Sequence, residues 1–300
     1  IAQGMAALRK KSHTAELTTT ARGKATAPAG RSATDAKGGV KLQQKEKMMS
    51  SLKDIISGQS LSPPIVLLYG PPGVGKTTFA GNAPKPIFIQ TEDGAGVVGA
   101  DRFPLAESYD AIEAQLGTLV KEDHDFKTLV IDSLDWLESL VWAKVCEAQG
   151  LKNIEDAGYG KGYVFALDFW RRFLNGVAAL RKQRGMAVVM IAHSHIRKFD
   201  DPAGEPYDRF EIKLHRKAGD LCMEASDLIG FANYRTATKQ IDGGFGRKIT
   251  RAVGTGERVL FTSERPAFIA KSRYSVPHEL PLEWSALVNA IVGKEKKDAA

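Results

Sequence analysis

The stretch GPPGVGKT, residues 70–77, restricts the fold of this chain more than any other feature. It matches the Walker A pattern G-x-x-x-x-G-K-[ST], in which glycines let backbone N–H groups turn inward around phosphate oxygens. The apolar run IVLLY at 65–69 precedes it, and TTFAGNA at 77–83 opens a helix that stops by Pro84. A buried strand, this loop and a helix, in that order, are typical of a site for a nucleoside triphosphate.

The residue types in this loop predict an ATP site with magnesium. Lys76 supplies a point charge to the β- and γ-phosphates, and the hydroxyl of Thr77 is a magnesium ligand. A second strand, TLVID at 128–132, ends in Asp132, which we expect to complete the magnesium site. A helix N-cap is the alternative role for Asp132. The expected ATP contacts are Gly70, Pro71, Pro72, Gly73, Val74, Gly75, Lys76, Thr77 and Thr78.

Short apolar runs alternate with amphipathic segments between residues 65 and 192. Apolar residues recur at helical spacing over 133–149 and in a longer segment that ends near residue 184. Strands that alternate with helices predict an α/β fold, with a mostly parallel sheet covered by helices on both faces. Shorter β-like pieces and a last amphipathic segment predict a C-terminal β-rich extension and a final helix. The strands of the parallel sheet are expected over 65–69, 86–90, 128–132 and 187–192. The β-like pieces are expected near 227–235, 247–253, 257–263 and 266–271, and the final helix over 282–292.

The positive charge is concentrated at the start of the chain. Residues 1–50 contain ten Lys or Arg against three acids, which equals the net charge of +7 for the whole sequence. A segment of this composition cannot bury enough apolar area to order itself, so we expect a disordered basic arm over 1–57. It is either a nucleic-acid-binding tail or, over 1–48, a non-native extension. An ATPase domain over 58–293 and a disordered tail over 294–300 complete the expected organisation.

Other compositional signals exclude several classes of function. No run approaches the roughly 18 apolar residues of a membrane span, and no basic segment leads into the apolar core of a signal peptide. Cys146 and Cys222 are isolated, which argues against a disulfide framework and a zinc site. We therefore expect a cytoplasmic protein with no membrane partner.

ATP hydrolysis needs a group that activates the attacking water. The residue directly after Asp132 is Ser133, where many related ATPases have a glutamate. The stretch PIFIQTEDG instead places Glu92 just past the strand 86–90. In a parallel sheet this position faces the crevice at the carboxyl ends of the strands, so we expect Glu92 to be the catalytic base.

The segments GPPGVGKTT, IFIQTEDG and LVIDSLDWL, in this order, resemble the RecA/RadA class of ATPases. GYGKGY at 158–163, AHSH at 192–195 and AKSRY at 270–274 resemble, more narrowly, the phage-encoded RecA-like ATPases of the Sak-four single-strand annealing group. The resemblance covers roughly residues 60–285. It implies a RecA-like P-loop NTPase fold and Mg²⁺-dependent, DNA-stimulated ATP hydrolysis in phage-type recombination, replication or repair. The host implied is a phage-infected or prophage-bearing bacterium.

The resemblance also implies functional roles for three residues to which the local sequence pattern gives none. His193 takes the position of a γ-phosphate sensor, with a hydrogen-bonded histidine at a strand end as the alternative. Lys271 and Arg273 resemble a basic pair that, in rings or filaments, reaches the nucleotide of the neighbouring subunit. The stretch keeps the Lys-x-Arg-aromatic spacing of the RadA motif K-N-R-F-G but has Ser272 and Ser275 for Asn and Gly. Ordinary surface charge is the alternative for the pair, and a single-strand-binding protein is a further candidate partner.

Residues 235–251, RTATKQIDGGFGRKITR, predict a basic hairpin with Gly-Gly near its turn. Basic side chains neutralise DNA phosphates, and an aromatic ring can stack on an unpaired base, which contributes ~1–3 kcal/mol per base. Within the loop expected over 193–219, the segment 197–217 has mixed charge, so a DNA-facing role and a merely solvated one are equally open. The candidate DNA contacts are Arg235, Lys239, Phe245, Arg247, Lys248 and Arg251.

Two functions from different classes are consistent with these features. The first is a RecA-like ATPase that self-associates, binds single-stranded DNA and anneals it. The alternative is a KaiC-like regulatory or scaffold ATPase whose nucleotide state controls oligomerisation and protein partners. The balanced charge after residue 50 favours the alternative, and the basic stretch 235–251 favours the first.

Overall fold

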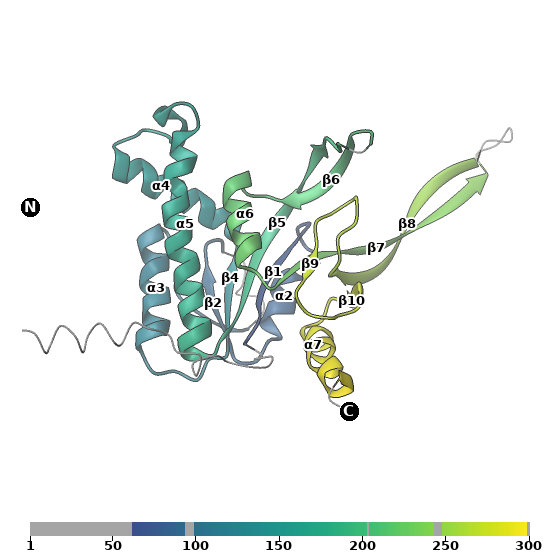
Figure 1. Cartoon of the computed structure of the whole chain (residues 1–300), viewed down its shortest axis with the longest axis horizontal. Helices are drawn as coiled ribbons and strands as arrows, with labels where there is room; N and C mark the ends of the chain where they lie inside the picture. Colours follow the sequence, from purple (N-terminus) through teal and green to yellow (C-terminus); the bar gives the residue numbers. More distant parts are fainter. Residues whose placement is uncertain (1–61, 94–98, 203, 243–247, 299–300) are drawn as a thin grey trace, which may run out of the picture. The chain divides into compact units, whose positions relative to one another are not determined.

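The computed structural model describes residues 62–93, 99–202, 204–242 and 248–298, without the side chains of 236–242, 248–255 and 294–298. The chain divides into two units, Ile1–Gln59 and Ser60–Ala300. The structure describes the second unit (Figure 1). The basic arm expected over 1–57 lies outside the described residues.

A sheet of ten strands forms the centre of the described unit (Figure 1). The pairs from β3 through to β7 are parallel, whereas β8 and β10 add antiparallel strands beyond β7. Two further strands lie off this row and are antiparallel, β6 (Tyr207–Ile212) on β5 and β9 (Lys271–Ser272) on β7. The row, in spatial order, is β10 (Glu279–Pro281), β8 (Lys248–Phe261), β7 (Leu228–Asp242), β1 (Ile65–Gly70), β5 (Ala187–Phe199), β4 (Thr128–Asp132), β2 (Pro86–Gln90) and β3 (Asp101–Arg102).

Helices cover both faces of the sheet, so alternate residues of each central strand pack into two separate cores. On one face, Leu67 of β1 lies in a core with Trp170 and Phe173. On the other face, Phe79 packs edge to face on Trp284, with ring centroids 5.7 Å apart. This arrangement confirms the predicted α/β fold with its β-rich C-terminal part and final helix. The helices are α2 (Lys76–Gly81), α3 (Tyr109–Lys121), α4 (Leu134–Gln149), α5 (Lys161–Ala179), α6 (Arg216–Ala225) and α7 (Trp284–Asp298), with short turns η3 (Ile154–Ala157) and η4 (Leu180–Arg184).

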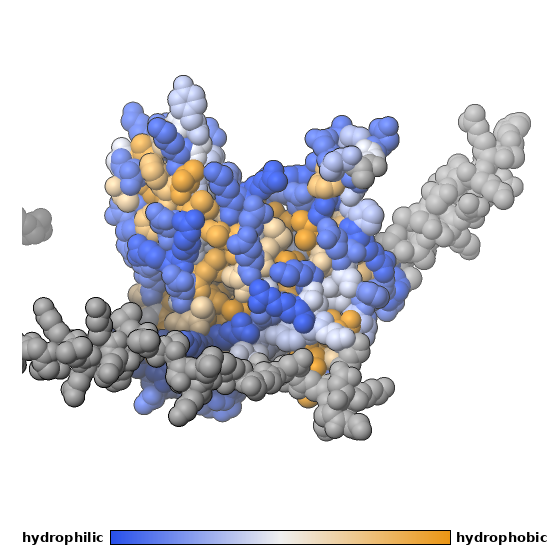
Figure 2. Space-filling view, in the orientation of Figure 1, coloured by the Kyte–Doolittle hydropathy of each residue, from blue (hydrophilic) through white to orange (hydrophobic). Residues whose placement is uncertain are grey.

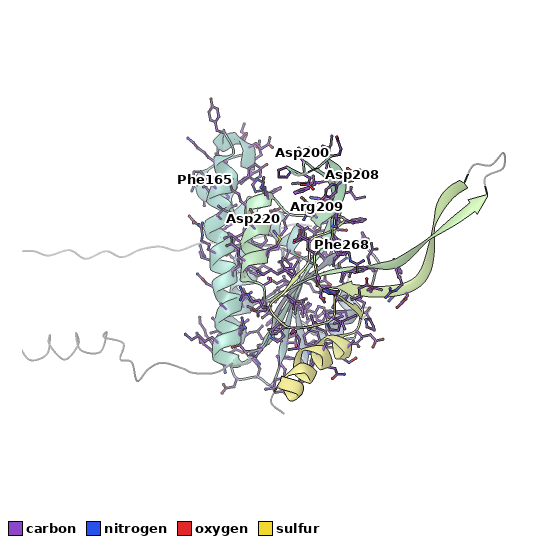
Figure 3. All side chains as sticks on the ribbon, turned by 45° about the vertical axis from the view of Figure 1, so that its right-hand side comes forward. Phe165, Asp200, Asp208, Arg209, Asp220 and Phe268 are labelled. Atoms are coloured by element: carbon purple, nitrogen blue, oxygen red, sulfur yellow. The ribbon has the colours of Figure 1, made fainter. Side chains whose placement is uncertain are left out.

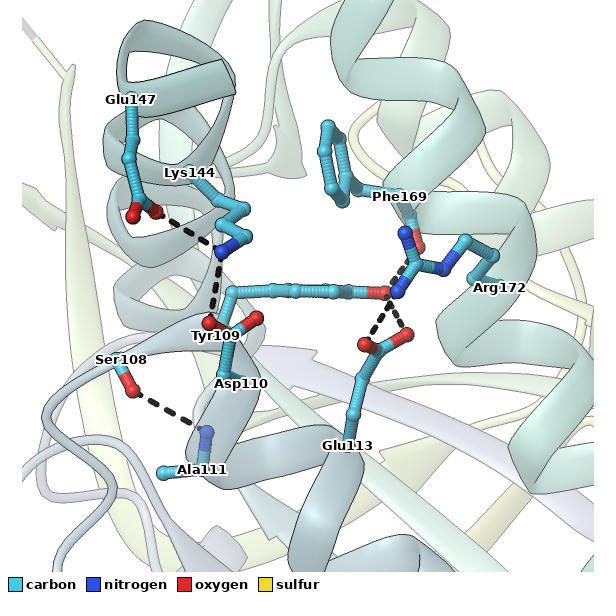
Figure 4. A network of polar contacts seen from close by, with 9 residues as sticks. All are labelled: Ser108, Tyr109, Asp110, Ala111, Glu113, Lys144, Glu147, Phe169 and Arg172. Atoms are coloured by element: carbon cyan, nitrogen blue, oxygen red, sulfur yellow. Dashed lines mark hydrogen bonds and ion pairs between the residues drawn. The ribbon is translucent and has the colours of Figure 1, made fainter. Parts of the chain in front are cut away.

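The sequence pattern did not predict α3, which polar contacts join to α4 and α5 (Figure 4). Ser108 caps its amino end by accepting a hydrogen bond from the N–H of Ala111 at 3.2 Å. The Tyr109 hydroxyl donates to the carbonyl of Phe169 at 2.7 Å, and Lys144 Nζ donates to Asp110 at 2.7 Å. The last two contacts depend on residues more than 30 positions away in sequence.

The prediction of a loop over residues 193–219 is wrong, because this segment forms two strands and the start of a helix. Strand β5 continues to Phe199 and pairs with β6, from Ser194 opposite Ile212 to Phe199 opposite Tyr207. Helix α6 then begins at Arg216. Asp200, Asp208 and Arg209 mark this β5–β6 hairpin in Figure 3. Its strands and α6 carry many charged residues, so their structure follows from pairing and packing rather than from an apolar run.

The far end of the chain also differs from the sequence expectation. The β-like pieces expected between 227 and 263 join into two long strands, β7 and β8, which form one hairpin. Helix α7 continues to Asp298, into the stretch 294–300 that the sequence places in a tail. Within the described part of the chain, no helix has the length and apolar character that a membrane crossing would require.

One buried carboxylate joins the amino ends of β1 and β7. Asp227 is 3% exposed and accepts a hydrogen bond from the N–H of Ile65 at 3.0 Å. It also forms ion pairs with Arg181 Nη1 at 3.1 Å and Arg273 Nη1 at 3.0 Å. A buried charge is tolerated only when it is paired and hydrogen-bonded in this way.

Replacing Asp227 with Ala is expected to lower the free energy of unfolding by about 3 kcal/mol, because two arginines and one amide lose their shared acceptor. Urea unfolding measures the change. The matched control is Asp123→Ala, since Asp123 pairs with Arg184 but is fully exposed, and exposed ion pairs contribute little. Equal unfolding midpoints for the two variants would contradict this account.

Candidate nucleotide site

The loop between β1 and α2 turns where only glycine is free of strain. Gly73 and Gly75 have φ values of 74° and 104°, in the left-handed region. A Cβ on Gly70 would lie 2.1 Å from the carbonyl oxygen of Ala232, so β1 and β7 approach too closely there for any other residue. The N–H of Phe79 donates to Gly75 at 2.9 Å as α2 begins. The amides before it therefore have no acceptor within the helix and are available to an anion.

Lys76 reaches back across this loop. Its Nζ donates to the carbonyl oxygens of Gly70 and Pro71, both at 3.0 Å, and the residue is 5% exposed. Burial lowers the pKa of Lys76, while the negative charges of Asp132, Asp135 and Glu92 oppose this shift. The ammonium group is thus fixed beside the loop, next to three carboxylates.

Thr77 of the phosphate loop and Asp132 at the end of β4 lie in contact, as expected for two residues of one magnesium site. Thr77 Oγ1 donates to Asp132 Oδ2 at 2.8 Å, which places two oxygen donors side by side. Burial raises the pKa of Asp132, and the bond from Thr77 and the charge of Lys76 partly offset this. Hard oxygen donors at a phosphate loop fit Mg²⁺. The residue at the N-cap of α4 is Ser133, so the alternative role for Asp132 as the cap is wrong.

Glu92 follows β2 at the same edge of the sheet. Thr91 fastens this segment to β4, because its N–H donates to the carbonyl of Asp132 at 2.9 Å and its hydroxyl donates to that of Ser133 at 2.7 Å. Burial raises the pKa of Glu92, and the charge of His193 opposes the shift. A half-buried carboxylate with a raised pKa has the character of a general base.

His193 is held at the end of β5 by a residue that the sequence analysis did not single out. Asp135, on the first turn of α4, accepts a hydrogen bond from the backbone N–H of His193 at 3.1 Å and lies 2.9 Å from its Nδ1. With Nδ1 donating to the carboxylate, Nε2 is the nitrogen left for another partner. Burial alone would raise the pKa of Asp135, but the hydrogen bonds from His193 outweigh burial and bring it to about 2. Asp135 lies three residues after Asp132, at the start of a predicted helix, and this position in the sequence could have indicated that it belongs to the site.

Lys271 and Arg273 lie near the amino ends of the central strands, on the opposite side of the sheet from the carboxyl ends that carry the phosphate loop. Strand β9 pairs antiparallel with the amino end of β7, with Lys271 opposite Ile229. Both side chains are exposed, but Arg273 is ion-paired with the buried Asp227, and Lys271 lines a cavity of about 650 Å³ beside α6. The structure therefore brings together Lys76, Thr77, Glu92, Asp132 and His193, and it separates Lys271 and Arg273 from them.

Four of the six candidate DNA contacts, Arg235, Lys239, Lys248 and Arg251, lie on β7 and β8. Arg235 is ion-paired with Glu257 at 2.8 Å and with Glu279 at 3.0 Å. The strand register places Lys239 opposite Arg251. Of the candidate DNA contacts, Phe245 and Arg247 lie outside the described residues. The side chains of Lys239, Lys248 and Arg251 are also outside the described part of the structure.

A glycine-rich loop at the carboxyl end of β1, with a Lys and a Thr beside an aspartate from a second parallel strand, defines a P-loop nucleoside triphosphatase. A family model described as an AAA domain, AAA_24, matches residues 62–274. The match covers more than half of the chain, and the chain belongs to this family.

Similarity to solved structures is weaker. The crystal structure of the RadB recombinase is 15% identical in sequence, and the alignment covers 76% of this chain and 92% of that chain. The TM-score is 0.40, so this likeness carries no argument about the site. No curated protein matches the chain.

One turn beyond Asp135, α4 presents a second buried carboxylate. Both oxygens of Glu138 lie 3.0 Å from the backbone N–H of His215, which precedes α6. The ring of His215 stacks on Tyr163, with centroids 4.3 Å apart. Burial raises the pKa of Glu138 to about 7, and the hydrogen bond from His215 opposes this shift. Helix α4 thus anchors both the end of β5 and the start of α6.

Replacing Glu138 with Gln is expected to flatten the pH dependence of stability. Between the usual pKa of 4.5 and the folded-state value of about 7, the folded state holds a proton that the unfolded state has lost. The free energy of unfolding therefore falls as the pH rises through this window. The variant lacks this fall, and at pH 8 it is expected to be more stable than wild type by roughly 2 kcal/mol.

Urea unfolding at pH 5, 6, 7 and 8 measures the difference between the two proteins. Glu147→Gln is the matched control, because Glu147 lies on the same helix with an exposed side chain. A constant difference between wild type and Glu138→Gln across the four pH values would contradict the assignment.

Proposed function

We propose that the chain is a Mg²⁺-dependent ATPase that acts on single-stranded DNA in recombination, replication or repair of the phage type, by annealing strands. The contact of 2.8 Å between Thr77 and Asp132 carries the ATPase part, because it joins the phosphate loop to a carboxylate from a strand that is not its neighbour. Membership of an AAA-domain family supports the same activity.

The residues at the carboxyl ends of the parallel strands have different roles in ATP hydrolysis. Bound ATP with magnesium supplies the scissile phosphoanhydride bond and the cation that Thr77 and Asp132 would hold. Lys76 exchanges its two carbonyl acceptors for phosphate oxygens. Glu92 orients the attacking water and accepts its proton, which its raised pKa favours. His193 presents Nε2 to the terminal phosphate, with Asp135 fixing the orientation of the ring.

Glu92→Gln is expected to bind ATP but to hydrolyse it roughly 10²–10⁴-fold more slowly, because glutamine cannot accept the proton. Lys76→Ala is expected to lose ATP binding itself. Calorimetric titration with ATP and a phosphate-release assay measure the two effects. Glu122→Gln, at the exposed end of α3, is the control, and hydrolysis by Glu92→Gln at the wild-type rate would eliminate Glu92 as the base.

The DNA part of the proposal is supported by the β7–β8 hairpin. Beyond Asn233 and Val259 its strands pair only with each other among the described residues. Such a strand pair can present the basic stretch 235–251 to a nucleic acid. Arg235 is already neutralised by Glu257 and Glu279, which reduces its share of that role.

A regulatory or scaffold ATPase with protein partners is the second candidate. Exposed apolar side chains on α4 and α5 favour it, namely Trp136, Val164 and Phe165. Figure 2 shows hydrophobic surface on the side of the molecule that carries these helices. Fluorescence anisotropy with a labelled single strand at several salt concentrations separates the two functions. Phosphate contacts impose a steep fall in affinity with salt, and the absence of binding at low salt would favour the scaffold.

We propose further that Lys271 acts on the nucleotide of a neighbouring copy in a ring or filament, as the resemblance of AKSRY implies. Its place supports this, because β9 pairs with the amino end of β7, whereas the phosphate loop follows the carboxyl end of β1. Arg273 is less informative, since its replacement also breaks the ion pair with the buried Asp227.

Mixing two inactive variants tests this role of Lys271. Lys271→Ala keeps an intact phosphate loop, and Lys76→Ala keeps an intact Lys271. If the lysine acts in trans, mixed assemblies contain some complete sites, and hydrolysis is expected to rise well above that of either variant alone. A mixture no more active than its components, although it co-assembles, would show that Lys271 does not complete a neighbour's site.

A further inference from the structure

Strands β7 and β8 bring two side chains to the phosphate loop. Tyr234 and Arg258 are partners across the antiparallel pair. The hydroxyl of Tyr234 donates to the carbonyl of Gly73 at 3.4 Å. A Cβ built on Gly75 would lie 2.9 Å from Nη1 of Arg258, so the guanidinium group lies directly over this glycine. One cross-strand pair thus contacts the loop at two points.

Among the described side chains, Arg258 differs from Arg235 and Arg265 in having no carboxylate partner. Arg235 pairs with Glu257 and Glu279, and Arg265 also pairs with Glu279. Among the described side chains, none forms an ion pair with Arg258, which is exposed. An unpaired guanidinium beside amides that lack acceptors is suited to a phosphate, since its planar fork binds two oxygens at once.

The strand order indicates which end of a nucleotide Arg258 would meet. Asp132, Glu92 and His193 come from β4, β2 and β5, which all lie on one side of β1. These residues mark the magnesium and terminal-phosphate end of the site. Strands β7 and β8 lie on the other side of β1, so their side chains approach the loop from the opposite end. A nucleotide whose γ-phosphate lies near Glu92 has its α-phosphate on the side of Arg258.

We propose that Arg258 binds the α-phosphate of nucleoside di- and triphosphates within its own subunit, with Tyr234 holding the strand pair against the loop. The inference rests on the proposed function for the presence of a nucleotide. It adds a residue from the C-terminal part of the chain to a site whose other residues from the same subunit, Gly70 to His193, lie in the first two thirds of the sequence. Arg258 is a binding residue in this account, because the bond that breaks lies at the other end of the triphosphate.

Arg258→Gln tests the assignment through the difference between ATP and ADP. Because both nucleotides carry the α-phosphate, calorimetric titration is expected to show about tenfold weaker binding of each. In hydrolysis the loss is expected in KM, and so in kcat/KM, rather than in kcat. Arg258→Lys is expected to lose less, since it keeps the charge without the fork. Arg102→Gln, another exposed arginine on β3, is the control and is expected to bind both nucleotides as wild type does.

Two results would overturn the assignment while leaving the proposed function intact. Unchanged affinity of Arg258→Gln for both nucleotides would show that Arg258 does not touch them. Weaker binding of ATP alone, with a lower kcat, would place the residue at the γ-phosphate instead. If wild-type protein binds neither ATP nor ADP, the proposed function itself fails and this inference fails with it. Circular dichroism and the Tm confirm that the variants are folded.

Discussion

The parallel register of β1, β5, β4 and β2 is the constraint on which the whole site depends. It pairs Gly70 with His193, and it pairs Asp132 with both Ile191 and Gln90. Four segments from distant parts of the chain therefore end in one row. Because side chains alternate between the faces of a strand, a slip of one residue in any pair would turn a functional group away from the loop. The buried apolar residues beneath this row specify the register and so protect the site.

The same physics explains how much could be predicted from the sequence. Strands β2 and β4 were predicted with their observed bounds, because strands buried on both faces are continuous apolar runs. Lys76, Thr77 and Asp132 could be predicted to lie together for a similar reason, since each belongs to a pattern that is local in sequence. The hairpin of β5 and β6 was missed, because its half-exposed strands are recognisable only by their pairing with each other. Local pattern predicts burial, and pairing across the fold needs the structure.

Residues whose roles depend on a distant partner were the least predictable. Asp135 is one acidic residue on a helix until β5 brings His193 to it, 58 positions later. Lys271 and Arg273 are two equivalent cations in the sequence. In the structure both are exposed, but Arg273 is ion-paired with the buried carboxylate of Asp227, whereas Lys271 forms no ion pair among the described side chains. The Lys-x-Arg spacing could not show this division, because the carboxylate that causes it lies 46 residues away from Arg273.

The register of β7 and β8 shifts between Tyr234 and Thr236. Such a shift bends a strand pair and increases its twist, so the hairpin has an inner part within the sheet and an outer part with its own direction. The pair that touches the phosphate loop lies at this joint. A ligand that reorients the outer part of the hairpin would therefore also move Tyr234 and Arg258, which contact Gly73 and Gly75 of the phosphate loop. Since coupling between two binding sites is reciprocal, each ligand would change the affinity of the other by the same factor.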